Sequence, residues 1–146
     1  MERKVLVIPE GTEVISRDYL HLLYKGETYE EVVIPKSVNR IEEGAFEDDK
    51  SLLKIIISRG IKEIPYCAFC GCKNLKEVWL PDTIESIGDY AFMYCSSLRF
   101  VNMPVVKSLG KDSFYQCYSL ESVALPDTLR EIGVNAFCEC TSLRSI

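Results

Sequence analysis

Apolar and polar positions repeat along this chain with a period of 23 residues between positions 34 and 101. The segment 80–102 reads LPDTIESIGDYAFMYCSSLRFVN, and segments 34–56 and 57–79 repeat its order of apolar and polar positions. Segments 103–124 and 125–146 continue the pattern with 22 residues each. A fixed period of this size is typical of a solenoid, in which each repeat forms one coil and stacks on the next.

Each repeat places the same kinds of side chain at the same positions, so the chain contains columns of equivalent residues. The aromatic column consists of Phe46, Phe69, Phe92, Phe114 and Phe137, and the aliphatic column before it of Ile41, Ile64, Ile87, Leu109 and Ile132. One coil cannot enclose these side chains alone. Stacked coils would place each Phe on the next Phe and create one continuous core.

Within one repeat the pattern predicts two short extended pieces separated by turns. The apolar run Val78–Leu80 is expected to be a strand of a parallel sheet that ends at Leu-Pro, because Pro cannot donate to the ladder. A second extended piece carries Ile84 and Ile87, and Gly88 then permits a bend. The Ala-Phe segment is expected to form a single helical or 3₁₀ turn, so the chain should contain little α-helix.

Segment 1–33 is predicted to be an atypical N-terminal capping coil. Tyr19 and Leu20 stand where the repeats have Ala-Phe, and RDYLHLLYKG has apolar residues near helical spacing. Terminal repeats are often atypical because they close the core against water. We therefore expect one domain, 1–146, made of this cap and the repeats 34–56, 57–79, 80–102, 103–124 and 125–146.

The combined pattern, LPxxLxxIGxxAFxxCxxLxxVxLP, resembles the BspA-like leucine-rich repeats of bacterial and protozoan proteins. The resemblance covers 34–146 closely and 7–33 loosely. It implies a right-handed, curved solenoid with short parallel strands that serves adhesion or protein–protein contact, often at a cell surface. It implies no catalytic residues.

Net charge and the lengths of the apolar stretches argue against several classes of function. The formal net charge is −5, and an acidic chain without a clustered basic face argues against nucleic-acid binding. No stretch approaches the roughly 18 apolar residues of a membrane span, and the N-terminus lacks the apolar core of a signal peptide. Free thiols favour a cytoplasmic location, whereas the family resemblance favours the cell surface or secretion, so localisation stays open.

Four of the seven cysteines occupy one column, three residues after the Phe: Cys72, Cys95, Cys117 and Cys140. Asp49 holds this position in repeat 34–56. Stacked Cβ atoms would lie about 4.8 Å apart, more than the roughly 3.8 Å of a disulfide. We therefore expect free, buried thiols that donate weakly toward turn carbonyls.

A metal site is the alternative reading of the cysteines. Cys67, Cys70 and Cys72 form C-x2-C-x-C, and Cys95 follows one coil later, so these thiolates could hold zinc or an iron–sulfur cluster. No second CxxC accompanies them. The single histidine, His21, lies in the predicted cap away from the cysteine column, which disfavours a Cys–His catalytic pair. We expect no enzymatic activity and no cofactor.

The main strand of each repeat should present alternate residues to solvent. If Val78 and Leu80 face the core, Glu77 and Trp79 face outward. The other partner-binding candidates at equivalent outward positions are Val33, Lys54, Ile56, Phe100 and Asn102. A contiguous apolar row on a sheet can mark an interface, and Trp is a frequent interface anchor.

The C-terminus predicts a second exposed surface, because Ile146 is a core-column residue and no capping coil follows it. Three explanations compete: the protein continues, a second molecule covers this edge by self-association, or the end is frayed. The main hypothesis is a non-enzymatic scaffold that binds a protein partner through the outer face of its parallel sheet. The alternatives are a cysteine-based metal or redox module and a structural spacer within a longer repeat array.

Overall fold

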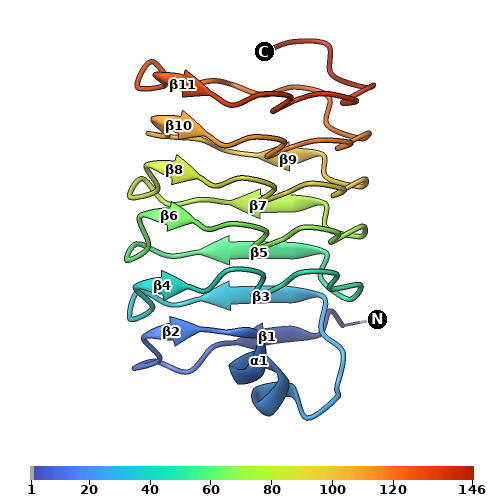
Figure 1. Cartoon of the computed structure of the whole chain (residues 1–146). Helices are drawn as coiled ribbons and strands as arrows, with labels where there is room; N and C mark the ends of the chain where they lie inside the picture. Colours follow the sequence, from blue (N-terminus) through green and yellow to red (C-terminus); the bar gives the residue numbers. More distant parts are fainter. Residues whose placement is uncertain (1) are drawn as a thin grey trace.

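The computed structural model describes residues 2–146 and is a parallel β-solenoid of about six turns with one short helix at its N-terminal end (Figure 1). The main sheet has five parallel strands in spatial order β1 (Val5–Val7), β3 (Glu31–Ile34), β5 (Lys54–Ile57), β7 (Glu77–Trp79) and β9 (Phe100–Val101). The predicted solenoid is confirmed, and the predicted strand 78–80 is shifted by one residue relative to β7.

The second extended piece of each repeat forms the opposite wall. There, β2 (Val14–Ile15) pairs with β4 (Arg40–Ile41), and a separate four-stranded sheet contains β6 (Glu63–Ile64), β8 (Ser86–Ile87), β10 (Ser108–Leu109) and β11 (Glu131–Ile132). All pairings in both walls are parallel and link residues one repeat apart. Residues at equivalent positions of neighbouring repeats are therefore the ones that pair in the sheets, so the sequence period sets the strand register.

The aromatic column fills the space between the two walls. Successive rings of Phe46, Phe69 and Phe92 have centroids 5.1 and 5.2 Å apart with interplanar angles of 10° and 2°. Phe114 and Phe137 continue the stack at 5.2 and 5.4 Å. The first four rings are buried, so the predicted continuous core is confirmed.

The Ala-Phe segment closes each coil as a series of β-turns. It keeps the i+3→i hydrogen bonds of the expected helical or 3₁₀ turn, as from Ala45 N–H to Glu42 O at 3.2 Å, but two residues per coil have positive φ. In one coil these are Tyr90 and Tyr94, with φ of 58° and 64°. The positive φ values point the N–H groups of these residues along the solenoid axis. There they donate to Lys111 O and Tyr115 O of the next coil. The turn therefore joins neighbouring coils, which a regular helical turn could not do.

The cysteine column lies beside this turn and joins coils in the opposite direction. Each thiol donates to the backbone carbonyl of the Phe in the preceding coil, at Sγ–O distances from 2.9 Å for Cys72 to 3.3 Å for Cys117. Cys95 and Cys140 make the same contact. All four are free and buried, as the sequence predicted. A Cys side chain suits this position because it is small, apolar and able to donate one weak hydrogen bond.

Asp49 replaces cysteine in the first regular coil and satisfies different groups. Its Oδ1 accepts from the N–H groups of Ser51 and Leu52 at 2.8 and 3.1 Å, and its other oxygen accepts from the Tyr29 hydroxyl. The Tyr29 ring stacks on Tyr24 at 4.0 Å between centroids. The carboxylate thus ties the first regular coil to the N-terminal segment.

Helix α1 (Arg17–Tyr24) lies at the N-terminal end of the solenoid, at the bottom of Figure 1. Ser16 begins the helix, because its Oγ accepts from Tyr19 N–H at 3.0 Å. Lys25 ends it in the left-handed conformation, with φ of 50°. Leu20 is buried at the position where other coils have Phe and belongs to the same core cluster as Phe46. The predicted short helix is confirmed.

The repeated glycine after the aliphatic column has a different role from the predicted bend. A Cβ on Gly110 would lie 2.4 Å from Asp89 N, and one on Gly133 would lie 2.4 Å from Gly110 C. The backbones of successive coils approach too closely here for any side chain. Close approach, rather than bending, therefore requires glycine at these positions.

Replacing Phe92 by Ala should lower the free energy of unfolding by about 3–5 kcal/mol, because it removes a fully buried ring from the middle of the stack. Urea or thermal denaturation followed by circular dichroism measures this loss. Phe100→Ala is the matched control, since Phe100 is 39% exposed on the outer face and should cost much less. Equal losses for the two variants would contradict the buried stack.

Under native conditions, Cys138 should react with a disulfide reagent long before the column thiols Cys72 and Cys95. Cys138 is exposed, whereas burial raises the pKa of the Cys72 and Cys95 thiols and keeps them protonated. Timed labelling followed by peptide mass spectrometry would assign each reacted thiol, and Cys138→Ser should remove the fast phase. Fast labelling of the column cysteines in the folded protein would show that the column is open to solvent.

Candidate functional site

The outer face of the main sheet carries two rows of side chains, set by the strand register. Val7 pairs with Val33, Val33 with Ile56 and Ile56 with Trp79, so these four residues form one continuous apolar row. The neighbouring row contains Val5, Glu31, Lys54, Glu77 and Phe100. The structure thus brings together Val33, Ile56, Trp79 and Phe100, and extends the predicted row through β1.

Trp79 and Phe100 form an aromatic pair at one end of the apolar row. Their exposed fractions are 42% and 39%. The ring centroids are 4.6 Å apart with an interplanar angle of 43°. The Trp79 indole N–H also donates to Glu77 Oε2 at 3.2 Å. The large ring is therefore held in place while a substantial part of its surface faces solvent.

Glu77 also links the aromatic pair to the adjacent strand. Its Oε2 lies 3.7 Å from Lys54 Nζ, across the β5–β7 pairing. This exposed ion pair contributes little stability, but it involves the same carboxylate oxygen that accepts from the indole N–H. Lys54 and Glu77 consequently position Trp79 and form a polar border for the apolar row.

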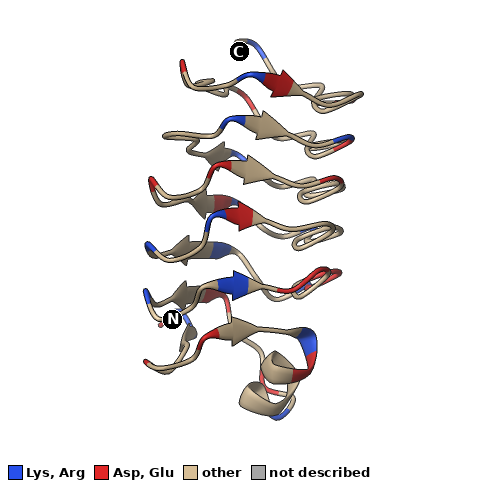
Figure 2. Cartoon of the chain, turned by 60° about the vertical axis from the view of Figure 1, so that its left-hand side comes forward, with Lys and Arg blue, Asp and Glu red and all other residues tan. Residues whose placement is uncertain are grey.

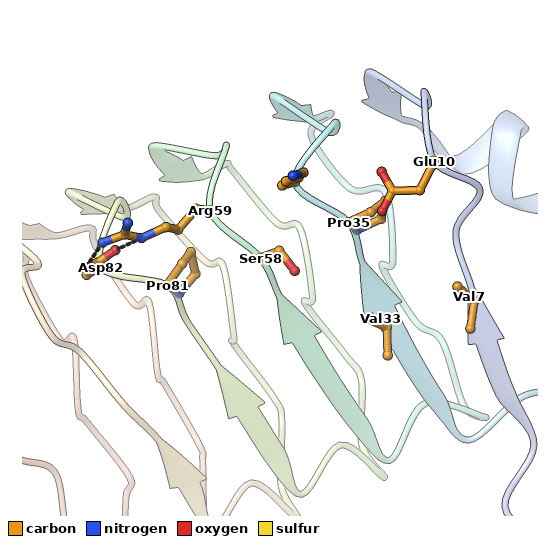
Figure 3. Close-up of a pocket in the computed structure, with 9 residues that line it drawn as sticks. Val7, Glu10, Val33, Pro35, Ser58, Arg59, Pro81 and Asp82 are labelled. Carbon is orange, nitrogen blue, oxygen red and sulfur yellow. Dashed lines mark hydrogen bonds and ion pairs between the residues drawn. The ribbon is translucent and has the colours of Figure 1, made fainter.

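A groove opens beside the apolar row, beyond the carboxyl ends of β1, β3, β5 and β7 (Figure 3). Its volume is about 650 Å³, and Val7 and Val33 are shared with the row. Prolines and a serine form its remaining wall: Pro35, Pro81 and Ser58.

Charged side chains of both signs surround the groove: Glu10, Lys36, Arg59 and Asp82. Figure 3 shows Arg59 and Asp82 paired, and Arg59 Nε donates to Asp82 Oδ1 at 2.7 Å. Hydrogen bonding to Arg59 lowers the pKa of Asp82, and hydrogen bonding to Asp82 raises the pKa of Arg59. Glu10 and Lys36 form no ion pair with another side chain in the part of the chain that the structure describes.

Asn102, another predicted binding residue, has a structural contact. Its Nδ2 donates to Leu80 O at 2.8 Å, and its Oδ1 accepts from Leu80 N–H at 2.6 Å. The side chain thereby replaces the backbone partners that a longer β9 would have supplied. Its polar atoms already have partners and are less available to another protein than those of Lys54 and Glu77.

The structure separates the four cysteines of the predicted metal alternative. Cys72 and Cys95 donate into the core, to Phe46 O and Phe69 O. Cys67 and Cys70 instead lie with Glu47, and the ligand atoms of these three residues are all within 4.8 Å of one another. Burial is the main cause that raises the pKa of Cys67 and raises that of Cys70 to about 12.

Sequence reasoning missed the contributions of Val5, Val7 and the groove. Val5 and Val7 are 49% and 66% exposed and alternate with Leu6, which was a detectable signal. The cap has an irregular repeat length, so the register of β1 against β3 could not be read from the period. The groove depends on how the loops after four strands lie beside one another.

Figure 2 shows basic and acidic residues interspersed among the coils. Within residues 2–146, no helix combines the length and apolar character that crossing a membrane requires.

Comparisons with known proteins agree with this architecture. A family model described as BspA type Leucine rich repeat region matches residues 21–144 in six copies. A leucine-rich repeat protein from T. pallidum is 32% identical with a TM-score of 0.75, over 80% of this chain and 59% of that chain. One from Bacteroides ovatus is 32% identical with a TM-score of 0.80, over 97% of this chain and 36% of that chain.

A leucine-rich repeat protein from Eubacterium ventriosum is 26% identical with a TM-score of 0.75, over 85% of this chain and 34% of that chain. The present chain thus spans less than two thirds of each of these three structures. No curated protein sequence matches it. Repeats of this class generally serve protein–protein interaction or adhesion as non-enzymatic scaffolds. The repeat columns, the solenoid and the family match together establish that this chain belongs to the BspA-type leucine-rich repeat family.

Proposed function

We propose that this chain is a non-enzymatic scaffold that binds a protein partner through the outer face of its five-stranded sheet. The observation that carries the proposal is the continuous apolar row Val7–Val33–Ile56–Trp79, extended by the Phe100 ring. Isolated exposed apolar residues need no explanation, but a contiguous row with a polar border is typical of an interaction surface.

Trp79 is the residue of this interface that we expect to contribute most to binding. Trp is among the residue types that carry most of the binding energy in many complexes when surrounding contacts exclude water. Glu77 and Phe100 already hold the indole in place, at 3.2 Å from Nε1 and 4.6 Å between centroids. Little side-chain entropy would be lost on binding, which favours affinity.

The groove beside the row suggests what the partner presents. Val7 and Val33 would contact an apolar side chain, while Glu10 and Lys36 stand at the border without ion-pair partners among the described residues. We infer a partner segment with an apolar residue flanked by an acidic group for Lys36 and a basic group for Glu10. Such complementarity would act mainly on partner choice and association rate.

Trp79→Ala should weaken binding of the natural partner by about 30-fold or more, which corresponds to a loss of roughly 2 kcal/mol. The measurement is a quantitative pull-down comparison from the cells that produce the protein, followed by calorimetric titration of the isolated partner. Tyr118→Ala is the matched control, because Tyr118 is 40% exposed but lies outside the main sheet. If Trp79→Ala and Phe100→Ala bind the partner as tightly as the unmodified chain and Tyr118→Ala, the outer face is not the interface.

Lys36→Glu should slow association with the same partner at low ionic strength, because it reverses a charge at the groove border. The difference from the unmodified chain should shrink as salt is added, since exposed charges are screened. Surface plasmon resonance at two salt concentrations measures both effects. An association rate that does not change, or that rises, would contradict the inferred acidic contact.

A further inference from the structure

Glu47, Cys67 and Cys70 form a cluster on the turn side of the solenoid, distinct from the outer face of the main sheet. One ligand atom from each residue lies within 4.8 Å of the other two. We propose that these three residues bind a thiophilic divalent cation of the zinc class. The site joins two coils, because Glu47 comes from repeat 34–56 and both cysteines from repeat 57–79.

The repeat register creates the cluster. Glu47 and Cys70 each follow the column Phe directly, so they occupy equivalent positions in neighbouring coils. Asp48 N–H donates to Cys70 O at 2.8 Å, which holds the two turns together. Cys67 has a φ of 51°, and its carbonyl accepts from Cys70 N–H at 3.2 Å, so a tight turn brings the two cysteines close.

Cys67 and Cys70 lack the structural role that explains the other buried thiols. The four column thiols each donate to the carbonyl of a Phe. Within residues 2–146, neither Cys67 nor Cys70 donates to a backbone carbonyl, although their exposed fractions are only 8% and 7%. The column pattern therefore accounts for Cys72 and Cys95 but not for this pair, whose thiols hydrogen-bond to each other and, for Cys67, to Tyr66.

The charges around the two thiols favour a cation. Burial is the main cause that raises the pKa of both thiols; hydrogen bonds to Tyr66 and Cys70 partly offset it at Cys67, and Cys67 adds to it at Cys70. Carboxylates raise the pKa further: Glu47 and Glu43 act on Cys67, and Glu47 and Asp48 act on Cys70. Burial and the neighbouring carboxylates therefore both disfavour the thiolate form when no cation is bound. A bound divalent cation would neutralise this negative charge and stabilise the deprotonated thiols.

Arg17 is the cation that already contacts the cluster. Its Nη2 lies 3.2 Å from Glu47 Oε2, and the two side chains are 56% and 41% exposed. An exposed pair of this kind is worth little. Arg17 also donates to Gly44 O and Glu47 O, so it can keep these contacts while the carboxylate turns toward a metal ion.

The distances fit zinc after a small adjustment. Tetrahedral coordination with Zn–S bonds of about 2.3 Å places two sulfur atoms about 3.8 Å apart. Atoms that already lie within 4.8 Å therefore need to move by about 1 Å. Two thiolates favour zinc-like ions over Mg²⁺ or Ca²⁺, which prefer all-oxygen sites. Three protein ligands leave the fourth position for water, and an iron–sulfur cluster would ordinarily need four cysteines.

Binding has a definite proton balance. Both thiols have raised pKa values and lose their protons on coordination, so one divalent cation forms two metal–sulfur bonds and one metal–oxygen bond to Glu47 and releases two protons. The affinity should accordingly fall as the pH is lowered. Calorimetric titration with Zn²⁺ in buffers of different ionisation enthalpy measures the proton release directly.

The test is titration of the reduced, metal-free chain with Co²⁺, which reports thiolate coordination by a near-ultraviolet charge-transfer absorption, followed by displacement with Zn²⁺. We expect one equivalent to bind. Cys70→Ser should weaken binding by about 100-fold and reduce the absorption, and Glu47→Gln, a surface substitution that should leave the fold intact, should weaken it by about tenfold or more. Circular dichroism verifies that each variant is folded.

Cys138→Ser is the matched control, because Cys138 follows its column Phe just as Cys70 does but is exposed. It should leave Co²⁺ binding unchanged. Absence of charge-transfer absorption, an equal loss in Cys138→Ser and Cys70→Ser, or unchanged affinity in Glu47→Gln would each overturn the proposed site. Loss of two mass units from the Cys67–Cys70 peptide in air, without metal binding under reducing conditions, would assign the pair to a disulfide instead.

Discussion

The coil-to-coil spacing of about 5 Å is the constraint on which the rest of this structure depends. Stacked Phe rings show it directly, with centroids 5.1–5.4 Å apart. At this spacing each coil can bond to its neighbours through both walls and the turn, so backbone polar groups are satisfied between coils as well as within them. The same spacing leaves no room for a Cβ at Gly110 and lets each column thiol reach the Phe carbonyl of the preceding coil.

A core shared among coils leaves the outward positions free to vary. The positions inside the columns are nearly uniform because every side chain must pack on the equivalent one above and below. Trp79, Phe100 and Cys67 are departures from uniformity at positions outside those columns. Because substitutions there do not disturb stacking, these are the positions where binding chemistry can be placed on a repeat scaffold.

Coil stacking produces the two proposed sites in different ways. On the sheet, the register lines up apolar residues from four strands into one long row. At the turn, the reversed backbone brings thiols and a carboxylate from two coils within 4.8 Å. An extended row suits a macromolecular partner, whereas a compact cluster suits an ion. The two sites lie on different sides of each coil and can be altered independently.

Much of this organisation was predictable because the repeat period is also the register of the parallel sheets. Once the columns were aligned, the buried Phe stack, the free thiols and the outward-facing Trp79 and Phe100 followed from local sequence. The short helix of the cap followed from the spacing of apolar residues around Leu20.

Only the tertiary structure decided features that depend on contacts between different coils. The role of glycine as a site of close backbone approach, the positive φ values of the turn and the internal bonds of Asn102 all arise from a neighbouring coil. The same holds for the grouping of Cys67 and Cys70 with Glu47 rather than with Cys72. Sequence spacing places cysteines on one coil, but the direction of each side chain, into the core or toward the turn surface, is decided by the backbone conformation that the adjacent coils stabilise.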